Sequence, residues 1–347
     1  MNSGHWRHRI VMVAVASALG LMTAEIGYRA VKIWRDDGVF YLASPSVHVR
    51  LHERYGWISH ANFRVERSDA CYGDAIVTYN AEGFRGPPLA EAADADVVVC
   101  VLGDSTMHGY QITDGQTFSH QLTRALSEHY RKPFVLPLAV GGYGTLQQWM
   151  LYEDYCRPLE PDLVLHHWAH NDPRNNSYRA ERYSAGADNN GMPRPYWEDG
   201  TTVVRRPYPI SLWDGFDTLL LVRRLNLGLL RATGHSHRQR EVYLEDGWQV
   251  ADHFLGRLAE EENPPLALVS EDETRAAALY ERHGYRVVRH APIGDAHRCL
   301  PRDSHLTAAG HRLLLEAALP SILAQLNQGV ARTDGHAPLG DSVPGGQ

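Results

Sequence analysis

From about residue 97 onward, short apolar runs alternate with segments of helical spacing. Val97–Leu102 contains no charged side chain and is rich in β-branched residues, which is typical of a strand buried on both faces of a parallel sheet. Strand-like runs of the same kind follow at 134–140, 163–167, 266–269 and 285–288. Helical patterns fall at 117–126, 145–155, 219–230, 250–261, 273–283 and 307–326. The alternation predicts an α/β fold, a single three-layer domain with helices on both faces of a parallel sheet.

Three other regions lack this alternation. Residues 37–96 are irregular and are expected to form a lead-in to the domain at 97–326. Residues 173–214, rich in Asn, Pro, Gly and Tyr, are expected to be a long insertion in that domain. Residues 327–347 are rich in Gly and Pro, so we expect a disordered tail.

Residues 1–36 carry an apolar segment that bears on location. The run Ile10–Ala24 has no charge, and its extension to Tyr28 adds only Glu25. A membrane-spanning helix needs about 20 apolar residues and the core of a secretory signal about 7–15, so the segment lies between the two. Poor cleavage signals favour an uncleaved signal-anchor, with cleaved export or a buried core helix as alternatives. The flanking Arg and Lys residues do not settle the orientation.

Composition excludes several classes of protein. The 347 residues have a formal net charge of −7, so the chain lacks a global basic field for nucleic acid. A mean hydropathy of −0.37 excludes a protein with many membrane spans. The four cysteines allow three pairings, and Cys100, within a core strand, is expected to be a buried thiol.

Twenty histidines invite a metal hypothesis, which the pattern does not favour. His166 and His167 adjoin in a predicted strand, where alternation places them on opposite faces. His170 follows at the turn, and no Cys or carboxylate cluster completes a tetrahedral set. We therefore predict no metal site and no cofactor.

The first chemically suggestive residues follow the first predicted strand. Gly103 permits a sharp turn, and Ser105 can then open a helix with its hydroxyl at the sheet edge. Backbone N–H groups at such a helix start can stabilise an oxyanion. The alternative is a serine that merely caps the helix.

Two candidate oxyanion donors follow the second and third predicted strands. The glycines near Gly142 allow the backbone to approach a ligand, so the Gly142 N–H is one candidate. Asn171 is the other, because its side-chain amide donates a hydrogen bond without a proton to lose. Both segments could instead be ordinary turns.

An acid and a base lie together before the last predicted helix. Asp303 and His305 are close enough in the chain for the carboxylate to orient the imidazole, which can then take a proton from a hydroxyl. A helix cap is the alternative.

These residues together resemble the SGNH (GDSL-like) hydrolase superfamily. The resemblance covers about 97–320, and its blocks run in order through Gly103-Asp104-Ser105, Gly142, Asn171-Asp172 and Asp303/His305. Upstream, Asn80-Ala81-Glu82-Gly83-Phe84-Arg85-Gly86 resembles the lead-in of bacterial membrane-anchored members. An α/β-hydrolase fits less well, because its nucleophile elbow needs a glycine where this chain has Met107.

The resemblance implies a role for each matched residue. Ser105 would be the nucleophile, His305 the general base and Asp303 its orienting acid. The oxyanion hole would comprise the Ser105 N–H, the Gly142 N–H and the Asn171 side chain. The chain departs from the family pattern twice: Arg302 stands where an Asp is frequent, and Pro137 where an Asn usually begins the glycine block.

The function expected from this reading is a serine esterase acting on acyl, especially acetyl, esters through an acyl-enzyme on Ser105. The alternatives are an O-acyltransferase that uses the same triad and a non-catalytic glycan-binding or assembly protein on this fold. A cell-surface carbohydrate is the expected substrate. The expected location is the bacterial inner membrane, with a single span and the domain outside the cytoplasm; the alternative is a secreted or periplasmic protein. The sequence gives no oligomeric state.

Overall fold

A computed structural model describes residues 3–35, 48–67, 71, 74–182, 192–205, 235–262, 264–301 and 303–333, with isolated positions at 221, 225, 229 and 232. The chain divides into two compact units. One comprises Arg64–Gly141, Leu151–His170 and Leu255–Gln347, and we call it the sheet unit. The other comprises Met1–Phe63, Gly142–Met150 and Asn171–Phe254, and we call it the insertion unit because it contains the predicted insertion.

The sheet unit contains the predicted parallel sheet. Its strands are β5 (Val97–Gly103), β6 (Pro133–Ala139), β7 (Leu163–His167), β10 (Leu266–Ser270) and β11 (Arg286–His290). They lie in the order β11-β10-β7-β5-β6, and every pair is parallel. The first of these strands therefore pairs with the second on one side and the third on the other, as in doubly wound flavodoxin-like sheets. In such sheets ligands bind where the strand order reverses, which here is the carboxyl end of β5.

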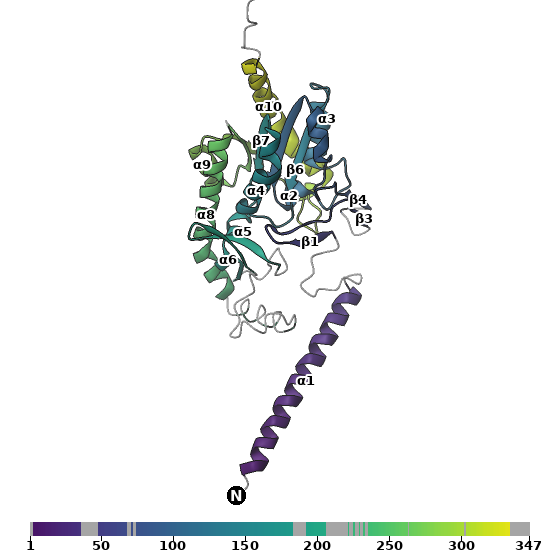
Figure 1. The fold of residues 1–347 in the computed structure, drawn as a ribbon, viewed down its shortest axis with the longest axis vertical. Helices are drawn as coiled ribbons and strands as arrows, with labels where there is room; N and C mark the ends of the chain where they lie inside the picture. The colour runs from purple at the N-terminus through teal and green to yellow at the C-terminus, as the bar shows by residue number, and fades with distance from the viewer. Residues whose placement is uncertain are drawn as a thin grey trace, which may run out of the picture. The chain divides into compact units, whose positions relative to one another are not determined.

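Helices cover both faces of this sheet, as predicted. On one face α3 (Phe118–Leu126) and α10 (Ala308–Thr333) pack over alternate strand residues, with Val99, Leu122 and Leu314 among the buried core. On the other face lie α9 (Thr274–Arg282) and η2 (Tyr152–Cys156), and the Tyr280 hydroxyl hydrogen-bonds His166 Nδ1 at 2.5 Å. Figure 1 shows strands β6 and β7 between α9 and α3. The α/β fold class is confirmed.

The lead-in is more regular than predicted. In the sheet unit, β3 (Arg64–Arg67) and β4 (Ala75–Thr78) form an antiparallel pair, and η1 (Leu89–Asp94) leads into β5. In the insertion unit, β1 (Val49–His52) pairs with β2 (Gly56–Ser59). The strands are four residues long, too short for alternation to be legible in the sequence.

The predicted insertion also has secondary structure. It contains α5 (Asp172–Asn176), α6 (Tyr178–Arg182) and an antiparallel hairpin of β8 (Arg194–Glu198) and β9 (Thr201–Arg205). Two further helices, α4 (Thr145–Leu151) and α8 (His235–Glu261), each have residues in both units. The helix predicted at 219–230 lies almost entirely outside the described residues.

Two helix ends differ from expectation. The segment predicted as one helix at 145–155 is α-helical only to Leu151 and then continues as η2 and η3 (Arg157–Leu159). Helix α10 continues to Thr333, so the predicted disordered tail is wrong for 327–333, while 334–347 lie outside the described residues. Pro320 lies inside α10, where burial of Ala318 and Ile322 against the sheet stabilises the helix around it.

Both pairs of cysteines form disulfides, Cys71–Cys299 and Cys100–Cys156, within the sheet unit. The expectation that Cys100 is a buried thiol is therefore wrong: its residue is fully buried, but its sulfur is bonded to Cys156.

The N-terminal segment forms one long helix, α1 (Ser3–Arg35). Within it, Trp6–Tyr28 is long and apolar enough to cross a membrane, by length and composition. Only 6% of the most apolar window of this span is buried, whereas a core helix would bury most of its side chains, so the core-helix alternative is disfavoured. A membrane anchor and a signal sequence remain.

Candidate active site

Ser105 lies directly beyond the carboxyl end of β5 and is the first residue of α2 (Ser105–His108). The N-cap of α2 is Asp104, whose Oδ1 accepts a hydrogen bond from the Thr106 N–H at 2.9 Å. Ser105 is therefore not the capping residue, which removes the structural alternative for this serine. The turn needs Gly103, because a Cβ there would lie 2.7 Å from Met107 Cγ.

The Ser105 hydroxyl donates a hydrogen bond to Asp104 Oδ2 at 3.2 Å. Asp104 is only 1% exposed, so its carboxylate is held by the cap and the serine together. Among the described residues no hydrogen bond joins Ser105 to His305. Proton transfer to His305 therefore requires the hydroxyl to rotate away from Asp104.

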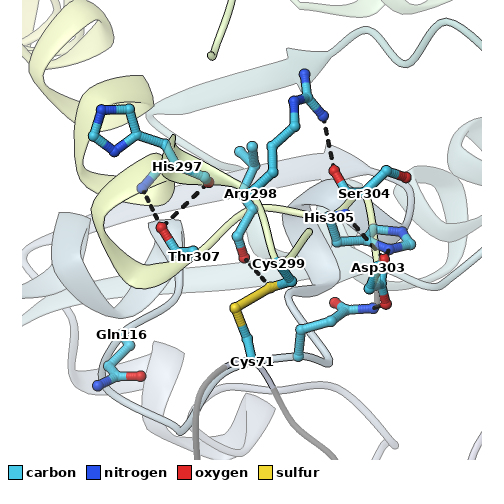
Figure 2. Close-up of a disulfide and its surroundings, with 12 residues drawn as sticks. Cys71, Gln116, His297, Arg298, Cys299, Asp303, Ser304, His305 and Thr307 are labelled. Carbon is cyan, nitrogen blue, oxygen red and sulfur yellow. Dashed lines mark hydrogen bonds and ion pairs between the residues drawn. A yellow bond between two sulfur atoms is a disulfide. The ribbon is translucent and has the colours of Figure 1, made fainter. Parts of the chain in front are cut away.

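Asp303 and His305 are brought together as predicted (Figure 2). Asp303 Oδ1 accepts two hydrogen bonds, from the His305 N–H at 2.9 Å and from His305 Nδ1. With Nδ1 donating to the carboxylate, His305 Nε2 is left as the acceptor for a proton. The side chains of His305 and Asp303 are 31% and 34% exposed, so both reach solvent. Helix α10 begins only at Ala308, so neither residue caps it.

The local charges favour a protonated His305 and an ionised Asp303. Burial by itself lowers the pKa of His305, but the hydrogen bond and charge of Asp303 and the charge of Asp104 outweigh it, and the pKa is raised. Burial likewise tends to raise the pKa of Asp303, but its hydrogen bonds from His305 and from Gln111 outweigh burial, and the pKa is well below its usual range. The pair has the electrostatics of a base with an orienting acid.

The lead-in motif supports this site through Arg85, which is 3% exposed. Its guanidinium donates to the carbonyl oxygens of His108 and Gly109, at the end of α2, and to that of Ile112 at 3.0 Å. It also pairs with Asp114 at 2.5 Å. The resemblance to the lead-in of anchored hydrolases therefore has a local structural reason: the arginine fixes the chain that follows the serine.

Gly142 and Asn171, the other predicted oxyanion donors, belong to the insertion unit. Gly142 has a φ of 79°, a left-handed conformation that favours glycine. Its carbonyl accepts hydrogen bonds from Arg194 Nη2 at 2.6 Å and Asn175 Nδ2 at 3.0 Å. Asn171 immediately precedes α5, and its side chain does not cap that helix. In the sheet unit, a Cβ on the preceding Gly141 would lie 3.8 Å from Ser105 Cβ.

Two of the three residues that contact the predicted site residues have no signature in the sequence. Asp104, Gln111 and Arg194 touch Ser105, Asp303 and Gly142 respectively. Gln111 and Arg194 lie 192 and 52 residues from their partners, so only tertiary structure reveals them. Asp104 was within the quoted motif, and its capping role could have been read from its place before a helix.

The histidines considered for metal binding have other surroundings. His166 hydrogen-bonds Tyr280, and burial lowers the pKa of His166 to about 3 and that of His167 to about 4. In the part of the chain that the structure describes, no group of three or more His, Cys, Asp or Glu residues could hold a metal ion.

Ser105 lies at the strand-order reversal, and the Asp303–His305 pair precedes the last helix. The order of these residues along the chain is the one that carries the resemblance to SGNH hydrolases. No protein-family model matches the chain, and no curated protein matches it.

Several solved structures match about two thirds of this chain at low identity, and the titles of some name an esterase. TesA is 12% identical, with a TM-score of 0.38 over 66% of this chain and 99% of TesA. A variant of Axe2, an acetyl xylan esterase from Geobacillus stearothermophilus, is 11% identical, with a TM-score of 0.34 over 67% and 95%. A Clostridium thermocellum family 3 carbohydrate esterase is 12% identical, with a TM-score of 0.36 over 67% and 98%.

Proposed function

We propose that this protein is a serine esterase of the SGNH type that cleaves acyl, especially acetyl, esters. The observation that carries the proposal is the Asp303–His305 hydrogen bond in the same unit as Ser105 at the carboxyl end of β5. A purely structural role does not explain the orientation of His305. It does not explain Ser105 either, because the N-cap of α2 is Asp104 and not the serine. The acid, the base and the nucleophile are then Asp303, His305 and Ser105.

The proposed reaction runs in two stages. The Ser105 hydroxyl turns from Asp104 to His305, Nε2 takes its proton, and Oγ bonds to the ester carbonyl carbon. The bond to the leaving alkoxide breaks as His305 returns the proton to it, which leaves an acyl-Ser105. Water then attacks the acyl carbon with its proton passing to His305, and the carboxylic acid leaves as Ser105 regains its proton.

The negative charge on the carbonyl oxygen needs donors that are already in place. We assign the Ser105 N–H, the Gly142 N–H and the Asn171 side chain to this role. The positive φ of Gly142 and the two hydrogen bonds that its carbonyl accepts support a fixed backbone turn at that donor.

The substrate we propose is an acylated carbohydrate outside the cytoplasm. Two disulfides favour an oxidising compartment, and the apolar helix Trp6–Tyr28 favours export with retention in a membrane. Transfer of the acyl group to an acceptor hydroxyl uses the same residues, and water and acceptor differ only in the second stage.

The test is labelling by a fluorophosphonate probe together with hydrolysis of p-nitrophenyl acetate and of O-acetylated glycans. We expect the wild type to be labelled and active and Ser105→Ala to lose both. Wild-type protein that neither reacts with the probe nor shows turnover dependent on Ser105 supports the glycan-binding alternative instead. Product that carries the acyl group on an added sugar supports the transferase.

A further inference from the structure

Gln111 contacts the predicted catalytic acid from the opposite side to His305. Its Nε2 donates a hydrogen bond to Asp303 Oδ2 at 2.9 Å, while Oδ1 of the same carboxylate serves His305. An ionised carboxylate only accepts, so the nitrogen of the Gln111 amide must be the atom that faces it. The two oxygens of Asp303 are thereby divided between two partners, which fixes the plane of the carboxylate.

The loop that carries Gln111 is itself held. Arg85 donates to the carbonyls of Gly109 and Ile112 on either side of Gln111 and pairs with Asp114 beyond it. The Gln111 carbonyl also accepts a hydrogen bond from the Cys71 N–H at 3.3 Å. Gln111 is therefore presented by a fixed backbone.

Cys71, the hydrogen-bond partner of this backbone, is joined by a disulfide to the loop that carries Asp303 and His305 (Figure 2). Cys71 is bonded to Cys299, whose carbonyl accepts from the Asp303 N–H at 3.1 Å and whose N–H donates to the His305 carbonyl at 2.9 Å. A closed circuit of hydrogen bonds and one disulfide thus runs from Gln111 through Cys71 and Cys299 to Asp303 and back to Gln111. No member of the circuit other than Asp303 has a predicted chemical role.

We propose that Gln111 is a positioning residue, which holds Asp303 in the orientation that directs Oδ1 to His305. This inference rests on the proposed function, in which Asp303 orients the base. Without Gln111, Asp303 can turn toward solvent, because its side chain is 34% exposed. The Asp303 contacts that outweigh the effect of burial on the pKa of His305 then weaken, so that pKa falls.

Other charged groups around His305 set the background for this shift. Besides Asp303, the charge of Asp104 raises the pKa of His305 and that of Arg298 lowers it. The nearby His311 is fully buried, and burial lowers its pKa to about 3, so it stays neutral at ordinary pH. None of these three groups changes when Gln111 is replaced, so a shift in the pKa of His305 reports a change in its contact with Asp303.

The test compares Gln111→Met with Gln116→Met, in full-length protein in detergent. Both variants lose an amide from the same stretch of chain, but Gln116 is exposed and bonds only locally, to Thr113 and Gln121. For Gln111→Met we expect kcat to fall about tenfold with KM nearly unchanged, since a hydrogen bond to a charged group is lost. We also expect the acid limb of kcat/KM to move to lower pH. Equal kcat and equal pH profiles in the two variants overturn the inference.

A second measurement separates this inference from the proposed function. In a Ser105→Ala background, titration of the His305 ring by NMR needs no turnover, and His305→Gln assigns the signal. We expect His305 to titrate at lower pH with Gln111→Met than with Gln116→Met. Equal titrations overturn the role of Gln111 even if the esterase is active. A lower titration in an inactive wild type supports the role of Gln111 and rejects the esterase.

Discussion

At the scale of single residues, the candidate site has two carboxylates, one hydrogen-bonded to the histidine and the other to the serine. Asp303 bonds His305, whereas Asp104 accepts the Ser105 hydroxyl and adds its charge to the field at His305. Asp104 is buried and also caps α2, so the serine rests on a rigid acceptor. In this arrangement the proposed nucleophile is held by Asp104 and is not hydrogen-bonded to the proposed base, His305.

The first prediction concerns the pH dependence of the wild type. Because the pKa of His305 is raised above its ordinary 6.5, the neutral base is depleted at a higher pH than for a free histidine. We expect kcat/KM to fall as pH drops through a value above about 6.5. A profile measured from about pH 5 to 9 checks this; one flat across that range contradicts His305 as the base.

The second prediction separates the two carboxylates. Asp303→Asn removes the charge and misorients the imidazole, so we expect kcat to fall by roughly 10²- to 10⁴-fold. Asp104→Asn retains an N-cap acceptor, so we expect a smaller loss and an acid limb shifted to lower pH, because one charge near His305 is gone. Steady-state kinetics over pH on both variants measures the difference. An Asp104→Asn variant as inactive as Asp303→Asn contradicts this assignment of roles.

At the scale of elements, the hairpin β8–β9 is connected to the glycine turn by a hydrogen bond from Arg194 to the Gly142 carbonyl, and Arg194 also forms a buried ion pair with Glu181 of α6. Arg194 and Glu181 are both fully buried, and the Arg194 Nε lies 3.0 Å from Glu181 Oε2. Arg194 also donates to Gln147 Oε1 at 2.5 Å and to the Gly142 carbonyl, and its guanidinium lies 4.8 Å from the Trp57 ring centroid. One side chain thus joins four segments of the insertion unit.

The third prediction follows from this pair. Arg194→Met leaves Glu181 as a buried charge without its partner, so we expect the free energy of unfolding to fall by about 3–5 kcal/mol. Replacing both residues, by Met and Leu respectively, should cost less than the two single changes together. Denaturant unfolding of the three variants measures this coupling. Additive losses contradict a coupled buried pair.

The fourth prediction concerns the Cys71–Cys299 disulfide, which spans 228 residues of sequence. Replacing both cysteines with serine frees the unfolded chain and loosens the loop of Asp303 and His305, so we expect a loss of about 2–4 kcal/mol in stability. We also expect a fall in kcat at temperatures where the variant is fully folded. Replacing Cys100 and Cys156 by alanine is the matched control, because neither adjoins that loop along the chain. Equal kcat in both double variants contradicts the link to the active-site loop.

The secondary structure shows where sequence patterns succeed. The strands of the parallel sheet were predictable because most of them contain a buried apolar run that can be recognised without knowing the neighbouring strand, as at Val97–Gly103. The antiparallel pairs β1–β2 and β3–β4 were missed because strands of four residues are too short for an alternating pattern to be told from chance. The Ser105 and Asp303/His305 motifs were legible because their chemistry is local. Gln111 and Arg194 were not, since nothing local marks a residue whose partner lies far along the chain.

At the scale of the whole molecule, the apolar helix and the disulfides point to the same compartment. The span Trp6–Tyr28 fits a membrane by length and composition, and disulfides persist where the environment is oxidising. The domain bearing Ser105 is therefore expected outside the cytoplasm.

The fifth prediction tests that placement. Expressed with its own N-terminal segment, the protein should remain in the membrane pellet after an alkaline carbonate wash and dissolve only in detergent. Its four cysteines should resist a maleimide reagent under denaturing, non-reducing conditions. A soluble product whose mass lacks the first helix indicates cleaved export instead. Four reactive thiols indicate a reducing compartment.

The position of Arg85 bears on where this protein can be divided. A fragment that begins at Val97, where the first strand of the parallel sheet starts, retains every residue of the sheet unit that we assign to catalysis. Val97 could therefore be taken for a domain boundary. Such a fragment lacks Arg85, however, and so leaves Asp114 and the carbonyls of Gly109 and Ile112 without their common donor. It also lacks Cys71 and leaves Cys299 as an unpaired thiol in the loop of Asp303 and His305. A fragment that keeps these contacts must therefore begin before Cys71, and the lead-in is an integral part of the folded sheet unit.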